Sequence, residues 1–236
     1  MSRYFLIVLT SLSFFLFPAM GLSDVIVHDI IALKGQEIML KAETRGKFLS
    51  KGGEVVEFFV NKKSIGKGLS GGNGSAFRRF ISLQPGIYHI TVKSGKDEGD
   101  GLLLSLKKGD RIVFIDVEDS LFEGLFSKKP RKESQEIIKK ISRRFPVVFL
   151  QTGLLGIKVI KKWLKENGFI ELPVVPWKDG MIFDEISEKG LKIKAIIGSQ
   201  AVIESAKAYK PKAFSFGEVE DAEEVKDWEE IGKKIK

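Results

Sequence analysis

The chain has 236 residues, of which 43% are hydrophobic and 30% charged, so it is globular and long enough for one large domain or two small ones. Its formal net charge of +8 favours anionic partners without choosing between phosphorylated ligands, anionic lipid and nucleic acid. The absence of cysteine excludes disulfide bonds, thiolate metal sites, cysteine nucleophiles and lipid anchors attached through cysteine.

The first 21 residues have the layout of a secretory signal peptide. Arg3 precedes an apolar run from Tyr4 to Phe17, which Pro18 ends, and Ala19-Met20-Gly21 offers small residues for cleavage. The run is short for a membrane span. We therefore expect a secreted, periplasmic or extracellular protein whose mature chain begins near Leu22. An uncleaved N-terminal membrane anchor is the alternative.

Residues 22–107 show short alternating apolar runs separated by glycine-rich turns, a pattern that predicts an all-β sandwich of roughly seven strands. The expected strands are Val25–Val27, Ile38–Leu40, Val55–Val60, Ala76–Ile81, Ile87–Val92 and Leu102–Leu106. The glycine and apolar pattern from Gly53 to Tyr88 resembles bacterial immunoglobulin-like modules, which implies a fold and little about function. His28 and His89 are expected to be ordinary strand residues rather than a metal pair.

From residue 108 to residue 236, strand and helix patterns alternate, which predicts a parallel sheet with helices on both faces. The expected strands are Ile112–Ile115, Val147–Leu150, Leu172–Val175 and Ala213–Phe216. Helices are expected over residues 128–144, from the turn after Gly153 to Asn167, over residues 195–209 and at the C-terminus. We place the domain boundary between residues 107 and 108 and expect each part to unfold cooperatively by itself.

The first of these strands runs into Asp116, Glu118, Asp119 and the hydroxyl of Ser120. Ligands of an open α/β sheet bind at the carboxyl ends of its strands. Alternate residues of an extended segment share a face, which would bring Asp116 and Glu118 together. Two close carboxylates suit Mg²⁺, or a nucleophile paired with an acid/base. A buried strand that ends in a solvated acidic turn is the alternative.

The sequence Asp116-Val117-Glu118-Asp119-Ser120 resembles the first motif of the haloacid dehalogenase-like (HAD) superfamily, Asp-x-Asp-x-Thr/Ser, with Glu in place of the second Asp. The resemblance implies an α/β fold class, a HAD-like Rossmannoid parallel-sheet domain preceded by the immunoglobulin-like sandwich. It also implies that Asp116 is a nucleophile and metal ligand and that Glu118 is the acid/base.

The second and third motifs of the same family, which bind the phosphate, also have counterparts in this sequence. Thr152 and Gly153 follow the second strand, where the family binds phosphate with a hydroxyl and backbone amides. Lys192 and Lys194 are the candidates for the lysine that neutralises the phosphate.

The fourth motif of the family supplies metal-binding acids after a strand. Glu218 and Asp221 occupy that place and would complete a Mg²⁺ site with Asp116 and Glu118. An acidic N-terminus that stabilises the last helix through its dipole is the alternative.

Within the superfamily, the likeness is to lipin-type and related phosphatidate phosphatase domains. It rests on Thr152-Gly153-Leu-Leu-Gly156, Asn167-Gly168, Leu172-Pro173 and Phe214-Ser-Phe-Gly217. This resemblance implies a Mg²⁺-dependent phosphomonoesterase, a hydrolase that forms an aspartyl-phosphate and acts on a phosphorylated small molecule or a phospholipid head group.

A catalytically degenerate binding or scaffold protein of the cell envelope is the alternative, because a carboxylate misplaced by on the order of 1 Å can cost about a hundredfold in rate. A basic segment would then face an anionic membrane surface, and the alternative is that its lysines only solvate a helix. Its residues are Lys128, Lys129, Arg131, Lys132, Arg143 and Arg144. Nucleic acid is not an expected partner, since no recognisable motif accompanies the charge.

Overall fold

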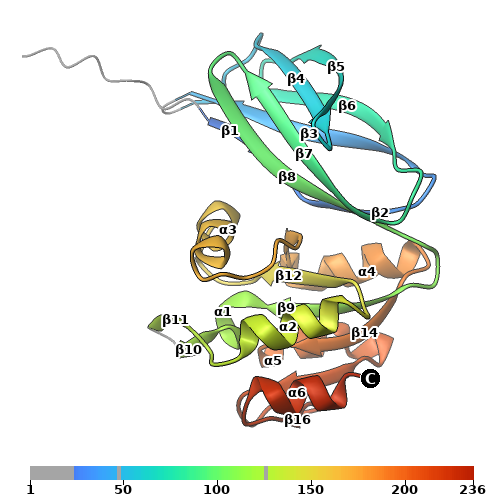
Figure 1. Ribbon diagram of the computed structural model, residues 1–236, viewed down its shortest axis with the longest axis vertical. Coiled ribbons are helices and arrows are strands. Elements are labelled where there is room, and N and C mark those ends of the chain that lie inside the picture. The colour runs from blue at the N-terminus through green and yellow to red at the C-terminus, as the bar shows by residue number, and fades with distance from the viewer. Residues whose placement is uncertain (1–23, 47–48, 125–126) are drawn as a thin grey trace, which may run out of the picture.

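The computed structural model describes residues 24–46, 49–124 and 127–236, in which a β-sandwich is followed by a parallel sheet with helices (Figure 1). The signal peptide expected at residues 1–21 lies outside these described residues. Within the described ranges, no helix combines the length and the apolar character needed to cross a membrane.

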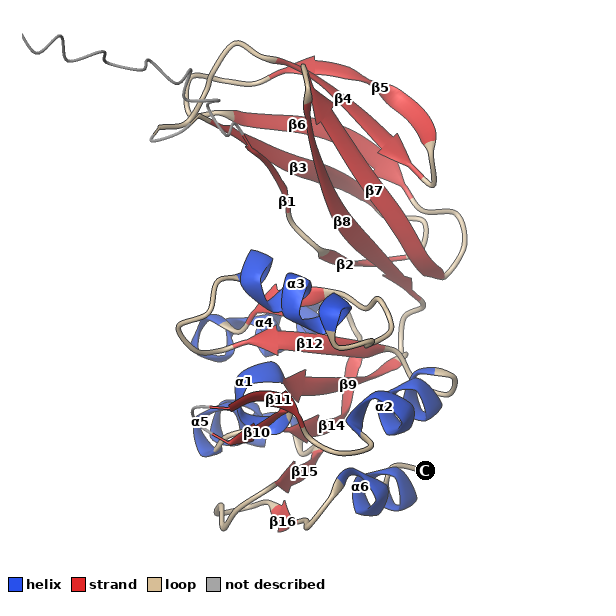
Figure 2. Ribbon diagram, turned by 60° about the vertical axis from the view of Figure 1, so that its left-hand side comes forward, coloured by secondary structure: helices blue, strands red, loops and turns tan. Residues whose placement is uncertain are grey.

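Two sheets face each other in the sandwich (Figure 2): one has the strand order β1-β3-β6 and the other the order β2-β8-β7-β4-β5. The strands are β1 (Asp24–Val27), β2 (Ile30–Leu33), β3 (Glu37–Arg45), β4 (Val55–Val60), β5 (Lys63–Leu69), β6 (Ser75–Ile81), β7 (Gly86–Ser94) and β8 (Asp97–Leu106). Leu40, Phe58 and Leu103 are fully buried between the sheets. The sequence did not predict β2 and β5, because β2 is short and β5 lacks apolar alternation.

An arginine covers the outer edge of β5, the last strand of its sheet. Arg78 on β6 donates from Nε to the carbonyl of Ile65 at 2.9 Å and from Nη1 to the carbonyl of Lys67 at 3.2 Å. Gly66 lies between these carbonyls with φ +117°, and a Cβ there would lie 2.2 Å from Arg78 Nη2. Glycine is therefore required for the guanidinium to reach both acceptors.

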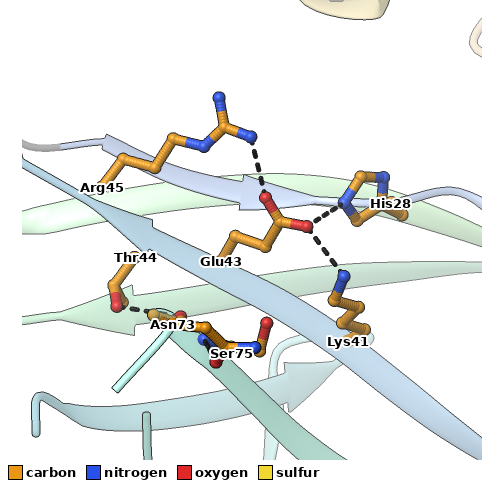
Figure 3. A network of polar contacts seen from close by, with 8 residues as sticks. His28, Lys41, Glu43, Thr44, Arg45, Asn73 and Ser75 are labelled. Carbon is orange, nitrogen blue, oxygen red and sulfur yellow. Dashed lines mark hydrogen bonds and ion pairs between the residues drawn. The ribbon is translucent and has the colours of Figure 1, made fainter. Parts of the chain in front are cut away.

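On β3, the carboxylate of Glu43 contacts three basic side chains (Figure 3). Its Oε1 lies 2.8 Å from Lys41 Nζ and 3.2 Å from His28 Nε2, and its Oε2 accepts from Arg45 Nη2 at 2.9 Å. The hydrogen bond from Lys41 is the largest cause that lowers the pKa of Glu43 to about 2, against the opposing effect of burial. The folded sandwich therefore favours the ionised carboxylate.

We expect Glu43→Gln to lower the free energy of unfolding by about 1 to 3 kcal/mol at pH 7. Because the pKa of Glu43 is lowered from 4.5 to about 2 by folding, its contribution is complete above pH 4.5 and is lost as the pH falls through 2. Denaturant unfolding at pH 7 and at acid pH measures the difference. Glu37→Gln, which removes a single exposed contact to Arg79 at 3.6 Å, is the control. A penalty for Glu43→Gln that persists undiminished at pH 2 would contradict this account.

The second half of the chain forms a six-stranded parallel sheet in the order β13-β12-β9-β14-β15-β16. Its strands are β9 (Arg111–Asp116), β12 (Val147–Gln151), β13 (Val174–Pro176), β14 (Lys192–Ile197), β15 (Lys212–Ser215) and β16 (Glu223–Glu224). The helices are α1 (Val117–Ser120), α2 (Ser134–Ser142), α3 (Ile157–Glu166), η1 (Lys178–Gly180), α4 (Met181–Glu188), α5 (Gln200–Ala206), η2 (Lys207–Tyr209) and α6 (Trp228–Lys234). A small hairpin joins β10 (Phe122–Gly124) to β11 (Ser127–Pro130).

Two predicted helices are shorter than expected. Residues 195–209 begin with the end of β14, because Ala195, Ile196 and Ile197 are fully buried and pair with β9. Only the part from Gln200 onward is helical. Residues 128–144 likewise begin in β11, and α2 starts at Ser134. In the first segment the apolar spacing did not distinguish a buried strand from the start of a helix. In the second, β11 has the sequence Ser-Lys-Lys-Pro and owes its strand to pairing with β10, which its own residues do not reveal.

The parallel sheet packs on two faces. Val113 and Ile115 of β9 point to α2, α3 and α6, whereas Ile112 and Phe114 point to α4 and α5. The sandwich contributes to the second of these clusters through Ile31, Leu104 and Leu106. The two halves of the chain therefore share one core cluster.

The proposed boundary between residues 107 and 108 stays a prediction. Because the sandwich supplies part of that shared core, we expect the fragment 108–236 to have a lower unfolding free energy than the same residues in the whole chain. Thermal unfolding of fragments 22–107 and 108–236 beside the whole chain measures this. Identical thermal midpoints for fragment 108–236 and the whole chain would show that the shared cluster does not stabilise residues 108–236.

Asp29, between β1 and β2, connects the sandwich to the parallel sheet. Its side chain is 0% exposed and lies 2.5 Å from Lys161 Nζ on α3. The same carboxylate accepts from the backbone amide of Leu102 at 2.8 Å and from that of Val174 at 2.7 Å. One carboxylate thus joins β8, β13 and α3.

Asp29→Ala is expected to destabilise the protein by about 3 to 5 kcal/mol, because it leaves a half-buried ammonium and two amides without their acceptor. Asp24→Ala is the matched control, since Asp24 pairs with the exposed Lys158 at the same junction and is expected to cost less than about 1 kcal/mol. Denaturant unfolding compares the two. Equal costs would mean that Asp29 does not hold the junction.

Candidate functional site

The carboxyl end of β9 carries Asp116, a residue that is only 1% exposed. Its Oδ1 accepts from the hydroxyl of Thr152 at 2.6 Å and from the backbone amide of Asp119 at 3.4 Å. Its Oδ2 accepts from the hydroxyl of Ser199 at 3.2 Å. Since β12 and β14 flank β9, the segments that follow three adjacent strands meet at this carboxylate.

Burial raises the pKa of Asp116, the hydrogen bond from Thr152 opposes that effect, and the charge of Asp119 adds to it. Burial also raises the pKa of Asp119, against the attraction of Arg131. Arg131 lies 4.2 Å from the centroid of the Phe216 ring and donates to the carbonyl of Asp119 at 3.4 Å. Burial thus makes the charged form of Asp116 more costly than it is in water, while the hydrogen bonds from Thr152, Ser199 and the Asp119 amide offset part of that cost.

The sequence predicted that Asp116 and Glu118 would share one face, and the structure separates them. Asp116 caps the short helix α1, so Glu118 lies in a helical turn rather than in an extended segment. Its carboxylate turns toward the segment after β12, where it accepts from the amides of Gly153 at 2.5 Å and Leu155 at 3.2 Å. A Cβ at Gly153 would lie 2.5 Å from Glu118 Oε1. The amides expected to hold a phosphate are bonded to a carboxylate of the chain itself.

Lys192 and Lys194 are not brought to this site. Both belong to the first residues of β14, and Lys192 is in register with Arg111 at the start of β9. Asp116 lies at the other end of β9, and the strands are parallel. The two lysines therefore occupy the amino edge of the sheet, opposite the carboxylate. They were misplaced because residues 195–209 were taken for a helix that the lysines would precede.

The four acids expected to bind Mg²⁺ do not form one donor set. Asp221 pairs with Lys207, Glu218 is exposed, and Glu118 is bonded to amides. Among the described residues, no group of three or more histidine, aspartate or glutamate side chains is placed to hold a metal ion. The arrangement around Asp116 does not fit a Mg²⁺ site, and Mg²⁺ binding itself stays an untested prediction.

Sequence reasoning missed Gly198 and Ser199. Gly198 allows close approach, because a Cβ there would lie 2.9 Å from the Cβ of Asp116, and Ser199 supplies the second hydroxyl. The apolar run before Gly198 carried the signal of a buried strand that ends in glycine.

No family model and no curated protein matches the chain. Similar solved structures include the D00-D0 domain of intimin, with 17% identity and a TM-score of 0.32, which covers 37% of this chain and 48% of that one. Domains 4 and 5 of the S-layer protein SbsC have 15% identity and a TM-score of 0.27, covering 36% of this chain and 53% of that one. A CARDB domain from Pyrococcus furiosus has 9% identity and a TM-score of 0.28, covering 36% of this chain and 91% of that one. The chain thus spans about half the length of the intimin structure that it matches.

The predicted HAD-like fold class and phosphatase activity are corrected, because no comparison supports them. The matched domains belong to the immunoglobulin-like kind expected for the sandwich, and none supports a HAD-like or lipin-type domain. The predictions of a HAD-like fold, of a phosphatase or other hydrolase, and of magnesium chemistry are therefore not supported. The motif Asp-x-Glu-Asp-Ser carried those predictions, and the side chains of its Asp116 and Glu118 are hydrogen-bonded within the protein.

We expect Asp116→Asn to leave the thermal midpoint at pH 7 unchanged or to raise it. The pKa of Asp116 is raised by burial, so the ionised group opposes folding above its unfolded pKa, and this opposition disappears as the pH falls and the carboxyl is protonated. The difference between variant and native protein should therefore shrink toward pH 4. Thermal scans across this range measure it. A large fall in the midpoint would mean that Thr152 and Ser199 require a charged acceptor.

Proposed function

We propose that the chain is a non-catalytic binding or scaffold protein of the cell envelope. The observation that supports this most directly is the state of Asp116, which is 1% exposed and bonded to two hydroxyls. A nucleophile must reach the reacting atom in line, and a carboxylate covered on all sides does not.

The Asp116 site then serves as a structural clamp. Thr152 and Ser199 tie the segments after β12 and β14 to β9, and Glu118 fixes the start of α1 to the amide of Gly153. A single intramolecular hydrogen bond contributes about 0.5 to 1.5 kcal/mol net. The clamp holds the carboxyl edge of the sheet in one arrangement, as a scaffold requires.

The envelope location rests on the N-terminal layout of Arg3, an apolar run and small residues. The immunoglobulin-like kind of the sandwich and the surface proteins among its structural neighbours are in keeping with it. The partners that suit the net charge of +8 are anionic: a phosphorylated small molecule, a phospholipid head group or an anionic membrane surface.

Turnover of a generic phosphomonoester with and without Mg²⁺ tests the non-catalytic role. We expect no activity that depends on Asp116, so the native protein, Asp116→Asn and Glu118→Asp should all match the background rate. Hydrolysis by the native protein that Asp116→Asn abolishes would overturn the proposal.

Mass spectrometry of the protein from its host tests the location. A chain that begins near Leu22 in the exported fraction is the expected result. Intact Met1 in a membrane fraction would replace export with anchoring, and a cytoplasmic full-length chain would contradict an envelope role.

A further inference from the structure

Basic residues gather at the amino edge of the parallel sheet. Arg111 opens β9, Lys192 and Lys194 lie at the start of β14, and Lys212 opens β15. Arg144 lies just before β12. These four strands are neighbours and parallel, so they begin at the same end of the sheet. Lys192 is level with Arg111, and Lys212 begins two residues further along, level with Ala195 and Val113. We call Arg111, Arg144, Lys194 and Lys212 the amino-edge cluster.

A β-bulge places Lys194 in this cluster. In the pairing of β14 with β9, Ile193 is opposite Ile112 and Ala195 is opposite Val113, so Lys194 is the extra residue. Bulges are uncommon in parallel sheets, and they re-aim a side chain. Here the Lys194 ammonium lies 5.2 Å from the centroid of the Phe145 ring.

Phe145 lies beside two cations. The guanidinium carbon of Arg144 is 5.6 Å from the centroid of the same ring. The face of the Phe145 ring attracts both Arg144 and Lys194, and this attraction offsets part of the repulsion between the two cations. The ring does not supply a negative charge, however, and the cluster stays strongly positive.

The amino-edge cluster has no acidic partner among the residues that the structure describes. None of its four side chains lies within ion-pair distance of a described carboxylate, although many exposed lysines elsewhere in the chain do, such as Lys140 with Glu136. Arg144 and Lys212 instead donate to the carbonyls of Ile235 and Lys234, each at 3.4 Å. Partial burial and the charges of Arg111, Lys212 and Arg144 lower the pKa of Lys194.

We propose that the amino-edge cluster binds a compact anion that carries two or more closely spaced phosphate groups. Lys194 and Arg144 share the Phe145 ring, and Arg111 and Lys212 lie on the strands that flank β14. An anion with several negative charges balances such a group better than a single carboxylate does, and phosphate accepts hydrogen bonds from both guanidinium and ammonium groups. The phosphates belong to a free oligophosphate or to the head groups of an anionic lipid surface. This site is independent of the Asp116 clamp, which lies at the opposite edge of the sheet.

Isothermal titration of the purified protein with tripolyphosphate, at about 10 mM and about 150 mM ionic strength, tests the site. We expect saturable binding that weakens at the higher ionic strength. Lys194→Gln and Arg111→Gln should each weaken it by about tenfold. Lys165→Gln, which removes one exposed lysine from α3, is the matched control and should change the affinity by less than about twofold.

Folding of the variants is monitored without ligand. Because Lys194→Gln removes one of several repelling charges, its thermal midpoint should be unchanged or higher, so that lost binding is not lost structure. Flotation with phosphatidylcholine vesicles, with and without phosphatidylglycerol, distinguishes the source of the phosphates. Binding to the anionic vesicles that tripolyphosphate displaces assigns them to lipid, and saturable tripolyphosphate binding without flotation assigns them to a free anion.

Two results would overturn the proposal. One is the absence of tripolyphosphate binding by the native protein at low ionic strength. The other is an equal loss of affinity in Lys165→Gln and Lys194→Gln, which would show a response to net charge alone. Neither result depends on whether Asp116 supports turnover.

Discussion

The carboxylate of Asp29 is the contact on which the arrangement of the two halves depends. It lies in the short connection between β1 and β2, yet its acceptors are used by β8, by the edge strand β13 and by α3. A buried charge is stable only when its hydrogen bonds are satisfied, and here both oxygens are used. The sandwich therefore contributes to the parallel sheet a polar anchor as well as the apolar surface of Ile31, Leu104 and Leu106.

The parallel sheet has different chemistry at its two edges. At the carboxyl edge, where an open α/β sheet usually binds its ligand, the acids are bonded to hydroxyls and amides of the chain itself. At the amino edge, positive charges meet without a described acid to balance them. At the first edge Asp116 and Glu118 are bonded within the chain, although Ser120 Oγ and Arg131 Nε are buried without a hydrogen-bond partner among the described residues. At the second edge the four cations have no described carboxylate within ion-pair distance.

The sequence predicted the central strand and the buried strand after it, because unbroken apolar runs such as Ile112–Ile115 allow little else. It failed where local pattern was ambiguous. The run Ala195–Ile197 precedes a real helix, and nothing in its spacing separates strand from helix. The misplacement of Lys192 and Lys194 followed from that single error.

The orientation of Glu118 was beyond sequence reasoning for a different reason. An acidic residue two positions after another lies on the same face in a strand and on a different face in a helix. The orientation of Glu118 depends on two residues. Asp116 caps the helical turn with its side chain, and Gly153 leaves room for the Glu118 carboxylate. Asp29 gave no signal either, since its partners lie far along the chain.

Arg78 and Gly66 affect whether the edge strand β5 can pair with another copy of the chain. Many copies of a sandwich held close together can pair edge to edge and polymerise, since each free strand edge is a template for the next molecule. The guanidinium of Arg78 bonds the outward carbonyls of Ile65 and Lys67 within its own molecule. These two carbonyls are therefore already occupied and do not serve as acceptors for the edge strand of another copy.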